Sequence, residues 1–370
     1  MPRPLVSTIS RTEWIQDIQQ NAQNVGLNLP TNGGTIPNDR FIHALWLEWE
    51  GRVTNAASNN PTGTQADGVT ALIDNFNIQG YHRVRGQQEQ FINMRGHDAY
   101  ELASLYSSRF FTSIPANLSL AANGTNDIRF FVYVPLTPLG VALEQQVDWL
   151  CDAPNYDSLK LTVNVADDQN IFTYGTRGAP TFTAFGSASG NPRIRVHADF
   201  AQAGRSQFAG FVPARAWRYF VEDTSSAETS TTANARLINI PKGYRIRNFL
   251  LKTGTKSTAV ASGNTAYATL IDTMLQNLKV FRGTNKVVRF YADQKTSRES
   301  GAQLYSVTPD LGYSLIDFAP RGSWHEALDT TGLAAGPTGD TDVYIGADTT
   351  GAANQATLAL FEELRGLPLG

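Results

Sequence analysis

Cysteine is almost absent from this chain of 370 residues, since Cys151 is the only one. A single cysteine excludes a disulfide within the chain and a zinc site built from thiolates. Long apolar runs are also lacking, and none approaches the roughly 20 residues that a membrane-spanning helix requires. Residues 1–4 do not begin the apolar segment of a secretory signal. We therefore expect a protein that begins close to residue 1 and is made in a cytosol.

Charge is scarce as well. Charged residues make up 17% of the chain and the net charge is −3, whereas soluble domains average about 25%. A subunit that hides much of its surface against other subunits would show this deficit, because the cores of interfaces are poor in charge. Alternatively, Asn, Gln, Ser and Thr supply the polarity instead. No cluster of Lys or Arg is present, so we expect no direct binding of nucleic acid.

The residue clusters that carry enzyme chemistry are missing too. None of the histidines stands in a His-x-His or His-Glu-x-x-His pattern, and there is no Gly-x-Ser-x-Gly elbow or Gly-rich phosphate loop. Asp167 with Asp168, or Asp340 with Asp342, could bind Ca²⁺ through oxygen atoms, although turn capping explains them more simply. We expect no enzyme, no catalytic, cofactor-binding or metal-binding residue, and no cofactor. The histidines, expected in the core or on the surface, are His43, His82, His97, His197 and His325.

Two tryptophans and two glutamates alternate along one predicted strand. Trp46 and Trp49 with Glu48 and Glu50 could form a sugar platform with paired acids, as in glycosidases. Successive side chains of a strand point to opposite faces. Trp46, Glu48 and Glu50 therefore share one face, and Trp49 points to the other. This pattern favours a core strand that reaches solvent at its end.

What the sequence does contain is a pattern that occurs twice, at an offset of about 200 residues, which is the size of a domain. The order of the matching residues is the same in both halves, which indicates two similar domains. The first copy is Leu72-Ile73-Asp74, Arg85-Gly86, Phe91 and Leu105-Tyr106-Ser107; the second is Leu270-Ile271-Asp272, Arg282-Gly283, Phe290 and Leu304-Tyr305-Ser306.

Short strands separated by Gly-, Pro- and Asn-rich turns dominate both halves, which suggests sandwiches or barrels. Residues 201–213 are expected to connect the halves. In the first half we expect a helix over His97–Ser108, a second one beginning at Thr137-Pro138, and an Asn123-Gly124 hairpin turn. The expected strands are 41–54, 69–84, 88–94, 110–120, 128–134, 159–165, 181–185 and 193–200, then 217–221, two around the turn at Pro241-Lys242-Gly243 within 237–252, 275–281, 286–291, 313–318, 343–346 and 357–364.

The N-terminal region has a helical pattern. Ser10 and Glu13 form a capping box, and apolar residues follow at helical spacing up to Val25. We expect an amphipathic helix over residues 10–25. Such a helix could cap its own domain, dock on a neighbouring subunit or lie on a membrane, although its polar face has few cations.

Two segments of the sequence resemble segments of a known protein family. Ala153–Leu161 enters a strand after a short helix, and Ile240–Tyr244 opens a strand in the second half. Together with two consecutive sets of strands, they resemble the double-jelly-roll major capsid proteins of tailless, internal-membrane-containing icosahedral viruses, the tectivirus and corticovirus group among phages. The resemblance implies an all-β fold of two tandem eight-stranded jelly rolls with a few short helices. We expect an N-terminal helix and arm over residues 1–36, the first roll over 37–205 and the second over 206–370.

The resemblance also implies a function. The chain would be a structural subunit that forms homotrimers, whose six jelly rolls give a pseudo-hexagonal tile of a virion shell assembled in the host cytoplasm. Its partners would be neighbouring trimers and vertex proteins, and the N-terminal helix could contact an internal membrane. The alternative function is a carbohydrate-binding or carbohydrate-cleaving β-sandwich of a phage fibre or spike, supported by aromatic residues near acids. A minor vertex protein is a further option.

Overall fold

The fold is described from a computed structural model in which the chain divides into two compact units. The first unit is Met1–Trp217 with Ala259–Ala266, and the second is Arg218–Thr258 with Tyr267–Gly370. The structure describes residues 9–17, 25–29, 41–83, 86–106, 117–136, 150–151, 153–201, 215–222, 231–256, 267–283, 286–320, 326–330, 342–352 and 354–366.

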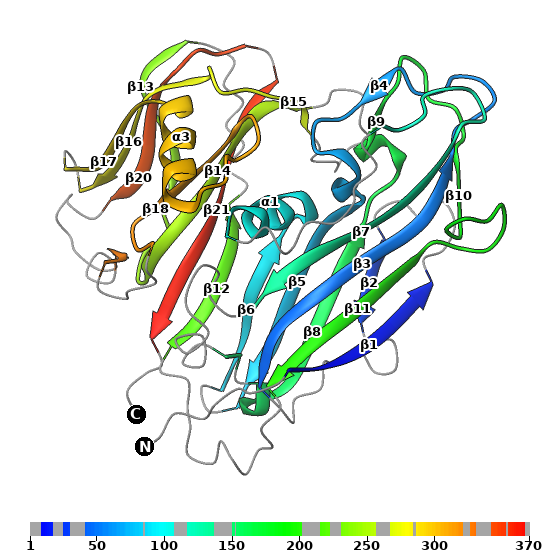
Figure 1. Ribbon diagram of the computed structural model, residues 1–370. Helices are drawn as coiled ribbons and strands as arrows, with labels where there is room; N and C mark the ends of the chain where they lie inside the picture. Colours follow the sequence, from blue (N-terminus) through cyan, green and yellow to red (C-terminus); the bar gives the residue numbers. More distant parts are fainter. Residues whose placement is uncertain are drawn as a thin grey trace. The chain divides into compact units, whose positions relative to one another are not determined.

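The first unit contains two antiparallel sheets, which lie one in front of the other in Figure 1. Helix α1 (Gly96–Tyr106) comes directly after β6 (Gln87–Met94), the edge strand of one of these sheets. Two short strands, β4 (Gly63–Thr64) and β9 (Phe172–Thr173), pair with each other outside both sheets. Short 3₁₀ helices span Gly68–Leu72, Ala153–Asn155 and Asp168–Asn170. One sheet has the order β1 (Ile9–Asp17), β11 (Arg193–Ala201), β3 (Ile42–Thr54) and β7 (Thr125–Pro135), with β10 (Thr181–Thr183) beside the end of β3; the other has β2 (Val25–Leu29), β8 (Tyr156–Val165), β5 (Ile73–His82) and β6 (Gln87–Met94).

Alternation of side chains builds the core of this unit. In β8, Leu159, Leu161 and Val163 are buried, while the residues between them are only half-buried. In β3, Leu45 and Leu47 are buried opposite Val134 and Val132 of β7. Each sheet thus directs one apolar face inward, and burial of that face holds the two sheets together.

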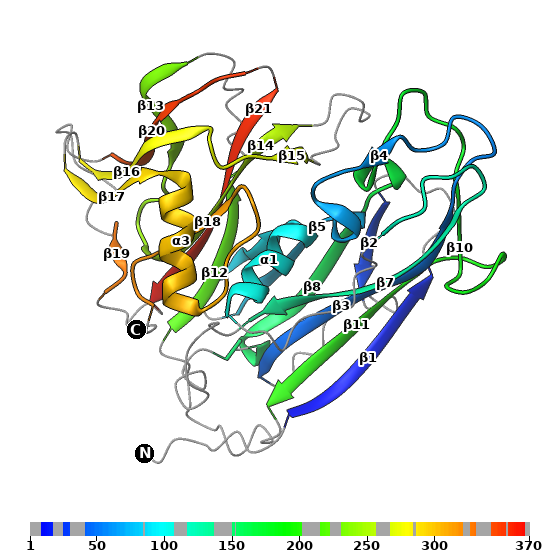
Figure 2. The same ribbon diagram turned by 45° about the horizontal axis from the view of Figure 1, so that its top comes forward.

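The main strands of the second unit repeat this arrangement (Figures 1 and 2). Helix α3 (Gln294–Tyr305) again follows the edge strand of one sheet, and it packs on β18. One sheet has the order β12 (Arg215–Glu222), β21 (Gln355–Gly366), β14 (Arg245–Lys256) and β18 (Tyr313–Asp317), with β15 (Tyr267–Leu270) and β19 (Leu328–Asp329) beside β14; the other has β13 (Thr232–Asn239), β20 (Val343–Thr349), β16 (Leu275–Arg282) and β17 (Val287–Asp293).

Each unit is therefore an eight-stranded jelly roll, and the predicted double jelly roll is confirmed. We call the units the first roll and the second roll. The repeated sequence marks fall on equivalent elements. Gly86 (φ 63°) and Gly283 (φ 77°) form the turns of β5–β6 and β16–β17 in a backbone conformation that favours glycine. Leu105 and Leu304 lie at the ends of α1 and α3.

The predicted N-terminal helix over residues 10–25 is wrong. Residues 9–17 form β1, which pairs with β11 in an unbroken register from Ile9–Ala201 to Asp17–Arg193. Residues 25–29 form β2 on β8. Pairing along a whole strand satisfies backbone groups on two strands at once, and such tertiary pairing overrides a local capping signal. The predicted boundaries at 36/37 and 205/206 stay predictions, and residues 18–24 lie outside the described part.

The two strands predicted around a turn within 237–252 are confirmed as β13 and β14, with Gly243 at φ 89° between them. These two strands belong to different sheets. The helix expected from residue 137 lies mostly outside the described residues. Of the strand expected over 110–120, only 117–120 are described and they are not a strand. Helix α3 was not expected at all.

A buried ion pair lies in the second roll. The Nη1 atom of Arg247 is 3.0 Å from Oε1 of Glu362, the side chain of Asn248 also donates to Glu362, and both charged side chains are buried. Burial raises the pKa of Glu362 to about 7, and the nearby charge of Arg247 only partly opposes this. At a pH between the ordinary pKa of a glutamate and about 7, Glu362 therefore keeps its proton in the folded roll and releases it in the unfolded chain.

This raised pKa predicts a pH dependence of stability. A carboxyl with a raised folded-state pKa stabilises the fold at acidic pH, and that contribution is lost as pH rises through the folded pKa. The stability of the parent protein relative to Glu362→Gln should fall by roughly 3 kcal/mol from about pH 4 to about pH 8. Urea unfolding of both proteins across this range measures the difference. A difference that does not change with pH would contradict the assigned pKa.

Candidate interface on the outer face of the first sheet

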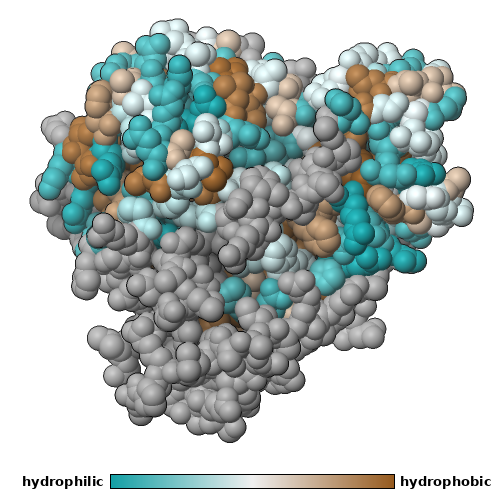
Figure 3. Space-filling view, in the orientation of Figure 1, coloured by the Kyte–Doolittle hydropathy of each residue, from teal (hydrophilic) through white to brown (hydrophobic). Residues whose placement is uncertain are grey.

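The β11–β3–β7 sheet of the first roll has a polar and aromatic face that points away from the core. Strand pairing places the side chains of this face in three rows across the sheet. We call them together the outer face. Its rows are His197–Trp46–Tyr133, Arg195–Glu48–Phe131 and Arg193–Glu50–Arg129. In Figure 3 the hydrophilic colour dominates the surface over β3 and β11.

Glu48 is the electrostatic centre of the outer face, with only 1% of its surface exposed. Its Oε1 accepts a hydrogen bond from Nε of Arg129 at 2.6 Å, and its Oε2 lies 3.2 Å from Nε2 of His197 and 3.6 Å from Nη1 of Arg195. Arg195 also donates to Glu50 at 2.6 Å. Both carboxylates are thus held by guanidinium groups. A buried carboxylate requires such partners, because unpaired it would cost several kcal/mol.

The aromatic residues of the outer face are fixed by specific contacts. Nε1 of Trp46 donates to Oδ2 of Asp199 at 2.8 Å, and its ring meets Tyr133 edge-on at 4.6 Å between centroids. Burial, together with the charge of Asp199, raises the pKa of the Tyr133 hydroxyl. These contacts give the face a rigid aromatic edge with little conformational freedom left to lose on binding.

Trp49 points the other way, as the alternation predicted. Its ring is buried and stacks on Phe130 at 6.0 Å between centroids. The two tryptophans therefore do not form a joint platform for a sugar ring. The interpretation of β3 as a core strand is confirmed, with Glu48 and Glu50 on the face opposite the core.

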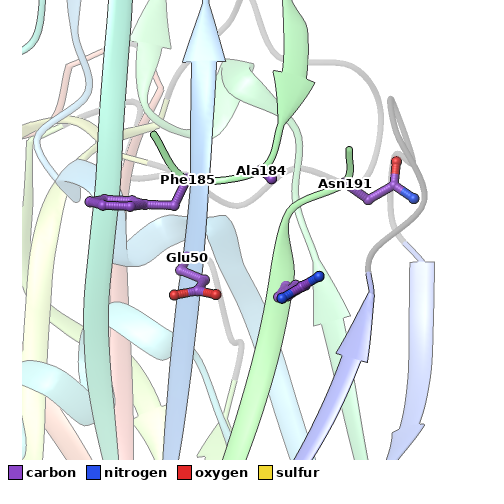
Figure 4. A pocket seen from close by; sticks show the side chains of 5 residues that line it. Glu50, Ala184, Phe185 and Asn191 are labelled. Carbon is purple, nitrogen blue, oxygen red and sulfur yellow. The ribbon is translucent and has the colours of Figure 1, made fainter. Parts of the chain in front are cut away.

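A pocket of about 170 Å³ lies at one end of the outer face. Figure 4 shows the carboxylate of Glu50 on β3 with Phe185, Ala184 and Asn191 from the loop before β11. Arg193, the first residue of β11, also lines the pocket. Phe185 is almost half exposed. The pocket extends the outer face with one exposed ring and charges of both signs.

The other residues considered in the sequence have structural surroundings. His82 packs edge-on against Tyr156, and Nδ1 of His97 is 2.6 Å from the hydroxyl of Thr70. His43 is half-buried on β3, whereas His197 belongs to the outer face. His325 lies outside the described residues.

The aspartates considered as calcium ligands are engaged with cations. Asp167 caps a 3₁₀ helix by accepting from the backbone of Gln169, as expected for turn capping. Arg177 contacts Asp168 at 2.5 Å and Asp167 at 3.3 Å. Burial and the charge of Asp168 raise the pKa of Asp167. Asp342 pairs with Arg236 and Lys242, and Asp340 lies outside the described residues.

Among the residues that the structure describes, no group of three or more His, Cys, Asp or Glu side chains could hold a metal ion. No described helix has the length and apolar character needed to cross a bilayer.

The strand predicted over 193–200 is part of the outer face, although its polar side was not singled out as a candidate site. Arg193, Arg195, His197 and Asp199 alternate with Ile194, Val196 and Ala198. Such alternation indicates a strand with one polar face. What the sequence does not contain is the register that places these side chains beside Glu48, about 150 residues earlier in the chain.

Comparison with solved structures shows the same fold along nearly the whole chain. The major capsid protein (MCP) of STIV has a TM-score of 0.64 at 14% identity, covering 96% of this chain and 97% of that one. The major capsid protein P2 from bacteriophage PM2 has a TM-score of 0.54 at 10% identity, covering 98% and 99%. PBCV-1 VP54 has a TM-score of 0.55 at 12% identity, covering 97% and 95%. No family model and no curated protein matches the sequence.

Proposed function

We propose that this chain is a major capsid protein, a structural subunit of an icosahedral virion shell. The observation that carries the proposal is the pair of jelly rolls with identical strand order, which matches viral major capsid proteins over at least 96% of the chain. The low charge content agrees, because a shell subunit hides much of its surface against neighbours.

The working form would be a homotrimer. Three chains, each with two similar rolls, together present six similar edges, so a trimer can occupy a hexagonal position in a closed lattice. A closed ring requires a head-to-tail contact that repeats around an axis. Each roll already pairs most of its strands within two packed sheets, so assembly proceeds through side-chain surfaces.

The remaining partners follow from this role. Neighbouring trimers and vertex proteins would contact the outside of each trimer. We expect no direct binding of nucleic acid. We also expect no catalysis by Glu48 and Glu50, because both carboxylates of the outer face are held by arginines. A membrane contact through a helix at residues 10–25 is not proposed, because residues 9–17 are a sheet strand.

Copy number tests this function against the spike or fibre alternative. Purified particles of the virus that carries this chain should show one dominant protein on a denaturing gel, at the 40.4 kDa of the chain. A shell subunit must outnumber every vertex or fibre protein. A minor band at this mass, with another protein dominating, would refute the proposal.

A further inference from the structure

The pocket at the end of the outer face is lined by groups of different chemical kinds. One is the aromatic ring of Phe185, which is 45% exposed, and the others include the carboxylate of Glu50 and the guanidinium of Arg193. In the view of Figure 4 the ring of Phe185 lies above the carboxylate of Glu50, while the amide of Asn191 points away from both. The volume of about 170 Å³ is smaller than the roughly 300–1,000 Å³ of pockets for drug-sized ligands, so the pocket suits a ligand of about one ring.

The exposed ring of Phe185 stands on a turn that is firmly held. The next residue, Gly186, adopts φ 67°, a backbone conformation that favours glycine. Its N–H donates to Oδ1 of Asp127 at 2.9 Å, and Asp127 accepts two hydrogen bonds of 2.8 Å from Arg52. The position of the ring is therefore fixed by the fold, and a ligand that covers it orders little that was free before.

The carboxylate of Glu50 has only one of its two oxygen atoms engaged. Oε1 accepts a hydrogen bond from Arg195 at 2.6 Å. No residue that the structure describes donates a hydrogen bond to Oε2. Because the side chain of Glu50 is only 12% exposed, water has limited access to this oxygen, and a donor group on a ligand would satisfy it.

The charges around the pocket favour a neutral ligand. Arg195 already balances the charge of Glu50, so a cation gains little there. An anion would be attracted by Arg193 but repelled by Oε2 of Glu50. A hydroxyl group can both donate and accept a hydrogen bond. Neighbouring hydroxyl groups of one ligand can therefore donate to Glu50 and accept from Arg193.

We propose that this pocket binds one pyranose ring of a neutral saccharide. Such a ring carries adjacent hydroxyl groups, which pair with Glu50 and Arg193. It also has a face of C–H groups, which packs on the ring of Phe185. An aromatic wall with a few convergent polar groups is typical of small-ligand sites. The site goes beyond the proposed shell function and does not depend on it.

The pocket is a site of binding and not of cleavage. Hydrolysis of a glycosidic bond commonly requires two carboxyl groups that flank the bond. Glu50 is the only carboxylate among the five residues that line the pocket. Glu48, the neighbouring acid of the outer face, is 1% exposed and accepts a hydrogen bond from Arg129.

Saturation-transfer NMR of the full chain tests the site, with the methyl glycosides of glucose, galactose, mannose and N-acetylglucosamine as probes at millimolar concentration. At least one probe should receive saturation on the C–H protons of one face of its ring. Phe185→Ala should weaken that binding roughly 5- to 10-fold, because it removes the surface on which the ring packs. Phe290→Ala removes a ring of 55% exposure in the second roll; it is the matched control and should bind the probe as the parent does.

The same measurement can overturn the proposal in three ways. The proposal is wrong if none of the four glycosides binds, or if Phe185→Ala binds them as well as the parent. It is also wrong if methylammonium or methyl phosphate binds this pocket more tightly than every glycoside, because the pocket would then select charge. Arg193→Met changes an exposed side chain and should also weaken binding, so it provides the test if Phe185→Ala does not fold.

Discussion

Replacing Arg247 with methionine is expected to lower the free energy of unfolding by roughly 3–5 kcal/mol. Arg247 is fully buried, and its guanidinium donates to Glu362 and to the carbonyl of Ala319. Methionine fills similar space but leaves the carboxylate of Glu362 without its cation in a site closed to water. The loss is largest above about pH 7, where Glu362 is ionised. Urea unfolding at pH 8 measures it.

Two further variants give this prediction its controls. In Arg247→Met with Glu362→Leu, no charge is left unpaired, and most of the lost stability should return, because replacing both members of a buried pair is often neutral. Arg83→Met breaks a pair with Asp157 in which both side chains are about half exposed, and it should cost less than about 1 kcal/mol. Equal losses for Arg83→Met and Arg247→Met would contradict the account of the buried pair.

Replacing Trp49 with alanine is the second change with a large expected effect. Its ring is 1% exposed and stacks on Phe130 within the core of the first roll. Removing a buried aromatic side chain loses its transfer free energy and leaves a cavity, at a cost of roughly 3–5 kcal/mol. Thermal or urea unfolding of the variant measures the loss.

Trp46 provides the matched control three residues away on the same strand. It is half-buried on the outer face and donates a hydrogen bond to Asp199. Trp46→Ala should therefore destabilise the chain clearly less than Trp49→Ala. If the two variants unfolded alike, the assignment of the two rings to opposite faces of β3 would be wrong.

The strands were largely readable from the sequence because their side chains alternate. β8 is the clearest case, and helix α1 was also found within two residues of its ends. α3 was missed because it has no apolar stripe, since the three residues it buries are Gln294, Ser297 and Gly301. The repeat contained the missing information, because Leu304-Tyr305 corresponds to Leu105-Tyr106 at the end of α1.

The prediction of an N-terminal helix over residues 10–25 was wrong for a different reason. Ser10 and Glu13 satisfy a local rule for starting a helix, but β11 offers hydrogen-bond partners to residues 9–17 along their whole length. Such a partner lies nearly 200 residues away in the chain, and no local window contains it. The prediction of the outer face was limited in the same way: the alternation placed Trp46, Glu48 and Glu50 on one face, while Arg129, Arg195 and His197, which surround Glu48, come from β7 and β11.

The most direct test of the central claim is the molar mass of the purified protein, measured by light scattering after size exclusion over a range of concentrations. The account predicts a mass three times the 40.4 kDa of one chain, held constant as the protein is diluted. A mass of one chain at every concentration, including the highest, would contradict it.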